Sequence, residues 1–463
     1  MFGRNGTSSD ARGLWKLSIV GTLVPFYLAL SPLSLLAQEQ VGTVQVTLAD
    51  AILMAETSDV TREIVGLEGL IAAEGVKQAK GQRRPRVSLK MEYVQKQQSI
   101  ISQDNETFQE GKSTYPVATV TLTVTQPIYD AERFRELPLA RAQEALAAAK
   151  AEAQLGDVNR QLVAAFIGVA QAQNRVQQAK LIESVRKEFA ADVAEMVESG
   201  RADLDQQMRA ESDVFAAETD VAETEAGLAE ALFSLQRFTG IEVGGVRGDG
   251  AFALADARSL AGTFSLEALD AMNPDIQIAM AELAVAERQL KQIKGRFQPT
   301  AEMKLEGEYT QSKGSLFGGG STVGSVDLGL ELNWSIYEGG VRRSQMRVAQ
   351  HQAEIAKRRI EQTRDAARGR FVALMKALEK ARAMVETAGR EQSISTERVL
   401  AAEESLAAGA GSREAVLEAG LRRDIARIAG STARMRAAQI QAEIYALFGA
   451  LDTDALSRDF AGG

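Results

Sequence analysis

Charged side chains stand an even number of positions apart in two short stretches of this chain. The charged residues of these stretches are Glu302, Lys304, Glu306, Glu308, Asp327 and Glu331. Because successive side chains of a β-strand point to opposite faces, these charges share one face and hydrophobic residues share the other. No second reactive group accompanies the carboxylates in a glycine-bounded motif, so they do not indicate an active site. We predict instead that they line a water-filled lumen.

The composition excludes several other kinds of site. The chain has no Cys, which rules out disulfides, zinc–thiolate sites and a thiol nucleophile. Its one His, His351, excludes a multi-histidine metal site and is a poor candidate for a catalytic triad. The formal net charge of −9 argues against a nucleic-acid surface. We expect no enzyme activity, no cofactor, no metal site and no nucleic acid partner.

The N-terminus has the pattern of an export signal, which we predict over residues 1–37. Arg4, Arg12 and Lys16 precede the hydrophobic run LSIVGTLVPFYLALSPLSLLA, which ends on Ala37. Prolines inside the run argue against an uncleaved membrane anchor, and the lack of a following Cys excludes a lipoprotein anchor. We therefore expect a protein that leaves the cytoplasm.

Four stretches alternate between hydrophobic and polar residues. They predict strands at about 87–96, 117–127, 300–311 and 323–335. One interpretation is a sheet with one face on a protein core. The rest of the chain is charged, Ala-rich helix that offers no such core, so a transmembrane β-barrel is favoured. Tyr93, Tyr309 and Trp334 would then lie at the lipid interfaces. Because four strands cannot close a barrel, the chain must oligomerise.

Most of the remaining sequence predicts helices, arranged in two similar halves. The motif TVTQPIYDAERF (123–134) recurs as ELNWSIYEGGVR (331–342), which indicates an internal duplication. The predicted organisation is a first repeat at 38–240, a linker at 241–263, a second repeat at 264–449 and a tail at 450–463. The predicted helices are 48–80, 130–199 and 202–238 in the first repeat, and 265–295, 339–408 and 412–448 in the second. Sustained three–four spacing of hydrophobic residues favours coiled-coil packing into long hairpins.

With these elements assembled, the chain resembles the TolC-like outer-membrane efflux protein family, the outer membrane factors of tripartite efflux and type I secretion systems. The likeness rests on QPIYDAERFRELPLARAQ (126–143), WSIYEGGVRRSQMRVAQHQA (334–353), NPDIQIA (273–279), SGRADLDQQMRAE (199–211), Pro85 and Pro299. The resemblance implies a homotrimer with a twelve-stranded β-barrel in the outer membrane and a periplasmic α-barrel of coiled-coil hairpins. It also implies partners: a periplasmic adaptor (membrane fusion) protein and an inner-membrane RND pump or ABC exporter.

The resemblance also implies a periplasmic gate at the hairpin tips. The family pattern at the first tip is matched by Gly200, Leu204 and Asp205. At the second tip Glu418 replaces one family acid, while Ala415 stands where the other would be. Arg413 could pair with a carboxylate of a neighbouring helix. We take Asp205, Arg413 and Glu418 as gate candidates, the alternative being that all three lie on a solvated helix face.

The function this predicts is a passive exit duct of a Gram-negative-type envelope, which exports small molecules or proteins delivered by the pump. Its mostly acidic lumen predicts a mild preference for cations. A dedicated type I protein secretion component has the same fold and stays open as an alternative. Rivals of other classes are a non-conducting, envelope-spanning structural coiled coil and an exported soluble adaptor. The exported substrate, the choice between RND and ABC partners and the resting state of the tip are left open.

Overall fold

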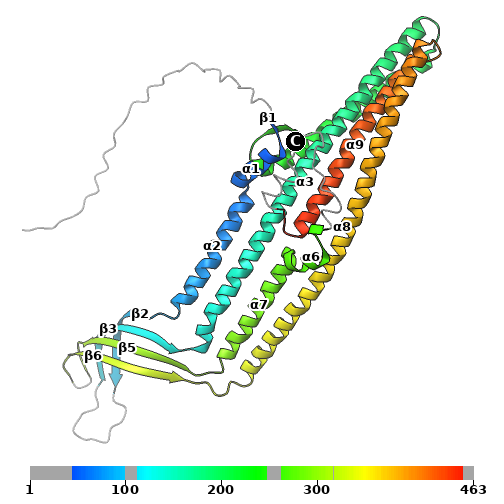
Figure 1. Cartoon of the computed structure of the whole chain (residues 1–463). Helices are drawn as coiled ribbons and strands as arrows, with labels where there is room; N and C mark the ends of the chain where they lie inside the picture. The colour runs from blue at the N-terminus through cyan, green and yellow to red at the C-terminus, as the bar shows by residue number, and fades with distance from the viewer. Residues whose placement is uncertain (1–43, 100–111, 248–261, 316–317, 452–463) are drawn as a thin grey trace, which may run out of the picture. The chain divides into compact units, whose positions relative to one another are not determined.

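The structure, a computed structural model, describes residues 44–99, 112–247, 262–315 and 318–451 (Figure 1). The predicted signal peptide and nearly all of the predicted tail lie outside these ranges. The described part is mostly helical, with one four-stranded sheet and one two-stranded sheet. No helix in the described ranges is both long and hydrophobic enough to cross a bilayer.

Four antiparallel strands form the larger sheet, in the order β2-β3-β5-β6. Their bounds are β2 Arg86–Ser99, β3 Lys112–Tyr129, β5 Thr300–Ser312 and β6 Ser321–Asn333. The register aligns Val87, Val124, Leu305 and Leu328 in one row across the sheet. The next row is Ser88, Thr123, Glu306 and Asp327. The sheet therefore has one hydrophobic and one polar face, as the alternation requires.

Two long helices leave the sheet, and each is followed by a turn and a second helix that runs back along it (Figure 1). They are α3, Ala131–Glu198, with 68 residues, and α8, Val341–Ala407, with 67 residues, each about 100 Å long at 1.5 Å per residue. The returning helices are α4, Leu204–Thr239, and α9, Arg413–Leu447. Gly200 and Gly409 sit in the turns with φ of 73°, a conformation that glycine adopts without steric cost. α9 packs against both α8 and α3, which joins the two hairpins side by side.

α3 continues through Pro138, which a helix interior normally excludes. Proline lacks an N–H, so the carbonyl four residues earlier, on Phe134, loses its helical donor. The Arg83 guanidinium donates to that carbonyl and lies over the Phe134 ring, 5.4 Å from its centroid. A side chain from the turn that precedes the first long strand thus replaces the missing hydrogen bond.

The structure corrects two of the predicted helices, because each is divided by a polar cap. The predicted helix 48–80 is two helices, α1 Leu48–Ser58 and α2 Val60–Gly81. The predicted helix 265–295 is likewise α6 Leu266–Met272 and α7 Pro274–Gly295. The Asp59 carboxylate accepts from Thr61 N at 2.6 Å, and the Asn273 side chain accepts from Ile276 N at 3.0 Å. Such caps begin a new helix where the backbone leaves the helical conformation.

Two short parallel strands were not predicted. They are β1, Val44–Val46, and β4, Val243–Val246, and β4 falls inside the predicted linker. Strands of three or four residues give too little alternation to recognise. They cover a hydrophobic core of α1, α3 and α4 that includes Ile52, Leu162 and Phe166. A second core, around Phe371 and Phe448, joins α6, α8 and α9.

The two halves have the same order of elements. A helix, two strands, a long helix and a returning helix follow one another as α2, β2, β3, α3 and α4, and again as α7, β5, β6, α8 and α9. The helices α2, α3, α7 and α8 pack in that order beside one another where they approach the sheet. The internal duplication and the repeat boundaries stay predictions.

Candidate functional site

The six charged residues predicted to line a lumen all belong to β5 and β6, on the polar face of the sheet. Glu302 pairs with Glu331, and Glu306 with Asp327, in the strand register. Lys304 Nζ lies 3.1 Å from Glu331 Oε2 and forms an ion pair with it. Glu308 follows two residues after Glu306 and lies opposite Thr121 of β3. The strands thus place all six side chains on one continuous polar surface.

The basic residues at the helix end of this face were not predicted from the sequence. Arg86 lies in the same row as Thr125 and Lys304. With Arg84, Arg133 and Glu302 it lines a cavity of about 380 Å³. Arg133 is 3.2 Å from Glu302 Oε1. Polar residues at positions 86, 88 and 90 alternate with hydrophobic ones, and this alternation could have identified Arg86. Near the helices the polar face therefore carries both basic and acidic groups, while the row that holds Glu306 and Asp327 carries acids alone.

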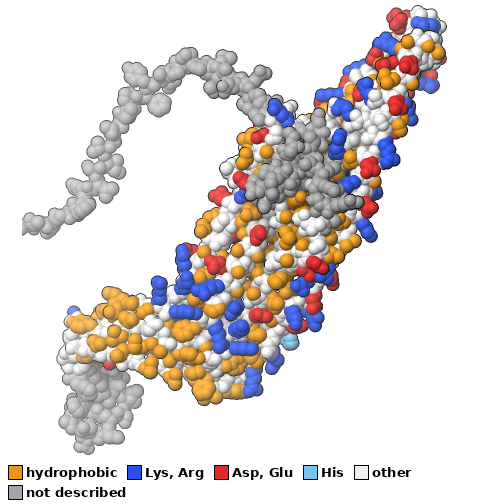
Figure 2. All heavy atoms as spheres, viewed as in Figure 1, with side chains coloured by type: hydrophobic (Ala, Val, Ile, Leu, Met, Phe, Trp, Pro, Cys, Tyr) orange, Lys and Arg blue, Asp and Glu red, His pale blue; other side chains and the backbone are white. Residues whose placement is uncertain are grey.

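The opposite face of the sheet is hydrophobic and uncovered. Leu89 is 59% exposed, and Val326 and Leu330 are 78% and 73% exposed. Figure 2 shows hydrophobic side chains gathered over the strands. Among the described residues no helix packs on this face, so the interpretation of a sheet resting on the chain's own core does not hold for a single chain.

The three predicted interface aromatics are exposed on or beside this sheet. Tyr93 and Tyr309 lie on β2 and β5, toward the strand-connecting loops, and are 74% and 53% exposed. Trp334 follows β6 at the helix end, where its Nε1 donates to Phe297 O at 3.3 Å. Tyr337, near Trp334, is also exposed and was not among the candidates. Aromatic residues therefore occur at both ends of the hydrophobic strand face.

The three gate candidates lie at the hairpin tips but do not meet one another. Asp205 pairs with Arg209 at 2.6 Å, and Glu418 pairs with Arg422 at 3.3 Å, each within its own helix. Only Arg413 reaches another hairpin.

Arg413 opens α9 and contacts two carboxylates of α3. Its guanidinium hydrogen-bonds Glu188 and lies 3.7 Å from Asp192. The hydrogen bond that Arg413 donates to Glu188, with the charges of Asp192 and Glu188, raises the pKa of Arg413 above its ordinary value. Glu188 and Asp192 were not singled out from the sequence, although two acids four residues apart share one helix face. These ion pairs join the two hairpins near the tips.

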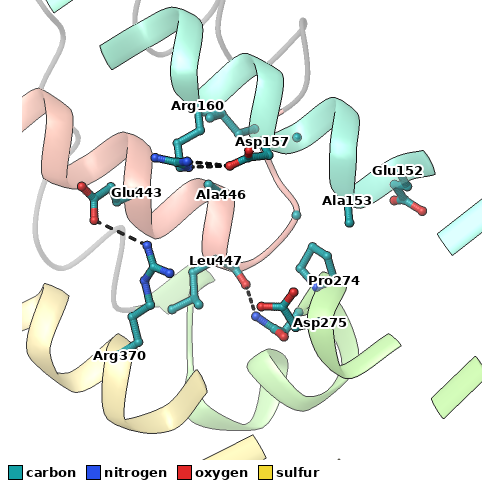
Figure 3. Close-up of a pocket in the computed structure, with 14 residues that line it drawn as sticks. Glu152, Ala153, Asp157, Arg160, Pro274, Asp275, Arg370, Glu443, Ala446 and Leu447 are labelled. Atoms are coloured by element: carbon teal, nitrogen blue, oxygen red, sulfur yellow. Dashed lines mark hydrogen bonds and ion pairs between the residues drawn. The ribbon is translucent and has the colours of Figure 1, made fainter. Parts of the chain in front are cut away.

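A polar cavity of about 210 Å³ lies where α3, α7, α8 and α9 come together (Figure 3). Arg160 pairs with Asp157 at 2.6 Å, and Arg370 lies 3.9 Å from Glu443. Asn273 Nδ2 donates to Leu447 O at 2.7 Å. The basic groups of the cavity are matched by acids, and no cluster suited to a metal ion occurs in the described part of the chain. We interpret the cavity as a polar contact region between these helices.

Comparison with known proteins identifies the class. Residues 266–450 match the family model described as outer membrane efflux protein. No protein of curated function matches the sequence significantly. Solved structures match the fold over most of the chain.

Three outer-membrane proteins illustrate this structural similarity. The Campylobacter jejuni CmeC outer membrane channel is 15% identical, with a TM-score of 0.73 over 88% of this chain and 87% of that one. VceC from Vibrio cholerae is 15% identical, with a TM-score of 0.68 over 88% and 97%. The open state of the Neisseria gonorrhoeae MtrE outer membrane channel is 16% identical, with a TM-score of 0.69 over 88% and 90%.

The fold is similar to that of these outer-membrane channels. The second half of the chain, residues 266–450, matches the outer membrane efflux protein family. The predicted family is thereby confirmed, and the protein is a channel component of an efflux system and not an enzyme.

Proposed function

We propose that this protein is a passive exit duct, a homotrimer with a twelve-stranded outer-membrane β-barrel and a periplasmic α-barrel. The observation that carries this proposal is a four-stranded sheet that exposes its whole hydrophobic face and leaves β2 and β6 unpaired at its edges. Open strand edges cannot lie in hydrocarbon, and only closure with other copies satisfies their backbone groups. β6 of one copy joining β2 of the next would close the barrel.

Hydrophobic stripes on the free flanks of the helices support the same assembly. On α2 the residues Val60, Ile64, Leu67 and Ile71 are spaced by four, three and four positions and are all exposed. On α8, at the other flank, Val341, Val348 and Ile355 are exposed at intervals of seven residues. Such spacing forms one stripe along a helix and is typical of a coiled-coil seam. The α2 stripe of one copy would pack against the α8 stripe of its neighbour.

The hairpin tips would dock on a periplasmic adaptor protein that links the duct to an inner-membrane RND pump or ABC exporter. Exposed Leu204, Met208 and Phe215 on α4 support this proposal, because they leave a hydrophobic strip near the first tip. An amphipathic helical hairpin is the partner that such a strip fits. Cargo then passes down a polar lumen while the pump supplies the energy.

Planar-bilayer conductance of the detergent-purified mature protein tests the proposal, with the oligomer mass measured on the same sample. We expect a trimer that gives discrete conductance steps. A stable protein that never conducts, even after its tip is loosened by substitution of Arg413, would favour a structural coiled coil. A monomer that fractionates as periplasmic would favour a soluble adaptor.

A further inference from the structure

Exposed basic side chains gather on the four helix ends that approach the sheet. They are Lys80 on α2, Arg141 on α3, Lys291 and Lys294 on α7, and Arg343 and Arg347 on α8. We call these six residues the basic belt. Each lies within about ten residues of its helix end, or about 15 Å at 1.5 Å per residue. The chain as a whole carries a net charge of −9, so its composition does not account for this concentration.

The side chains of the basic belt have no ion-pair partner within the described part of the chain. Among the described residues, none of its six side chains makes an ion pair or a side-chain hydrogen bond. Two of the nearby acids are already engaged, since Glu132 pairs with Arg296 at 2.7 Å and Glu338 with Arg342 at 2.9 Å. The belt therefore presents positive charge that no ion pair in the described part of the chain neutralises.

Helix dipoles do not explain the whole belt. Cations are favoured at helix C-termini, which suits Lys80, Lys291 and Lys294 at the ends of α2 and α7. Arg343 and Arg347 lie instead in the first two turns of α8, where the dipole disfavours a positive charge. Charges of one sign at helix ends of both polarities point to an external anion.

The position of the belt identifies the surface that this anion belongs to. Figure 2 shows Lys and Arg side chains gathered over the helix ends next to the sheet, on the same view that shows hydrophobic side chains over the strands. Exposed Trp334 and Tyr337 lie between the strands and α8. A hydrophobic band, then aromatic residues, then basic residues is the order that crosses from hydrocarbon through the interface to lipid headgroups.

We propose that the basic belt binds the headgroup phosphates of anionic phospholipids in the membrane leaflet on the helix side of the barrel. This inference rests on the proposed membrane insertion of the strands. The belt would fix the depth of the barrel and hold an annulus of anionic lipid at its periplasmic rim. Each Lys or Arg near an anionic surface contributes about 1 kcal/mol, or about fivefold in affinity.

Native mass spectrometry of the full-length mature protein can test this, with phosphatidylglycerol or phosphatidylcholine added to the detergent. The two lipids share acyl chains, so the difference in retention isolates the headgroup charge. We expect wild type to retain phosphatidylglycerol at least tenfold more strongly at physiological salt. The K291Q/K294Q/R343Q/R347Q variant should lose that preference, and K291R/K294R/R343K/R347K should keep it.

A matched control removes exposed positive charge from the same long helix away from the sheet. Lys376 and Lys380 of α8 are exposed and lie about 50 Å from Arg343 along the helix. K376Q/K380Q should leave the lipid preference unchanged. Equal retention of both lipids by wild type, or an equal loss in the control, would overturn the inference and would favour an acidic protein as occupant of the belt.

The conductance of each sample in a phosphatidylcholine bilayer separates this inference from the proposed function. Channels without a preference for phosphatidylglycerol would refute the basic belt as a lipid site but leave the duct intact. A preference for phosphatidylglycerol without channels would support the lipid site and count against the duct.

Discussion

Lys304 is the one basic residue among the six charged side chains predicted to line the lumen, and it is paired with Glu331. Glu306 and Asp327 lie opposite each other in the next row, and no ion pair involves either of them in the described part of the structure. Farther toward the helices, Arg86 adds positive charge that the sequence analysis did not count. A cation preference must therefore arise in the acidic rows of the strands, not along the whole lumen.

The first prediction concerns these acidic rows. Replacing Glu306 and Glu308 with Gln should shift the reversal potential in a KCl gradient toward zero, because negative charge lining a pore raises the local cation concentration. Glu386→Gln, at an exposed position on α8, is the control and should have no effect. A reversal potential of zero in the unmodified channel at low salt would mean that it has no cation preference, and would contradict the prediction.

At the tips, Arg413 is the candidate with a contact outside its own hairpin. Arg413→Gln should raise the basal current through the tip by about 1.4- to fivefold, since an exposed ion pair contributes roughly 0.2–1 kcal/mol. Single-channel recording at fixed voltage measures this directly.

Two comparisons make the Arg413 result interpretable. Arg422→Gln removes a charge whose partner, Glu418, lies on the same helix, so it should change the current less. Glu418→Ala should raise the leak slightly. Unchanged current in all three variants would assign these residues to a solvated helix face.

At the scale of elements, the buried amide of Asn273 lies at the break between α6 and α7, directly before Pro274 at the start of α7. Asn273 is 1% exposed, and its side chain both caps α7 and donates to Leu447 O near the end of α9. It thereby ties the start of one helix to the end of another, 174 residues away.

Asn273→Ala should therefore destabilise the protein by about 2–4 kcal/mol, the sum of a lost helix cap and a buried carbonyl left without a donor. Ser265→Ala, which removes only the cap of α6, should cost about 1 kcal/mol. Thermal unfolding followed by circular dichroism in detergent compares the two. Equal losses would show that the link to Leu447 contributes nothing.

At the scale of the whole molecule, a single chain is incomplete. Its sheet has two open edges, and the exposed stripes on α2 and α8 lie on the flanks of the helical layer. A stable, separate monomer would leave these hydrophobic surfaces in water, which monomeric proteins seldom do.

Placing charges on the α2 stripe should therefore block assembly. We expect the Ile64→Asp/Ile71→Asp variant to run as a monomer by light scattering in detergent, because an unpaired charge buried in a seam costs several kcal/mol. Leu70→Asp alters an equally exposed side chain of the same helix that lies off the stripe, and it should leave the oligomer intact. An oligomer that survives the double substitution would place the contact elsewhere.

The sequence by itself determined the elements whose pattern is local. The alternation in residues 301–310 and 326–334 predicted strands with one hydrophobic and one polar face, and the long heptad-like spacing predicted hairpins. The strand pattern repeats every two residues and the helix pattern every three to four. Both can therefore be recognised without knowledge of distant parts of the chain.

Only the tertiary structure decided the contacts between distant segments. The pairing of β1 with β4, the ion pair of Arg413 with Glu188 and the donation from Arg83 to the Phe134 carbonyl join residues that no local period connects. The gate candidates illustrate the difference, since Asp205 and Glu418 proved to pair within their own helices and Arg413 did not. Which side chains meet depends on which helices pack together, because ion pairs and hydrogen bonds act only over a few ångströms.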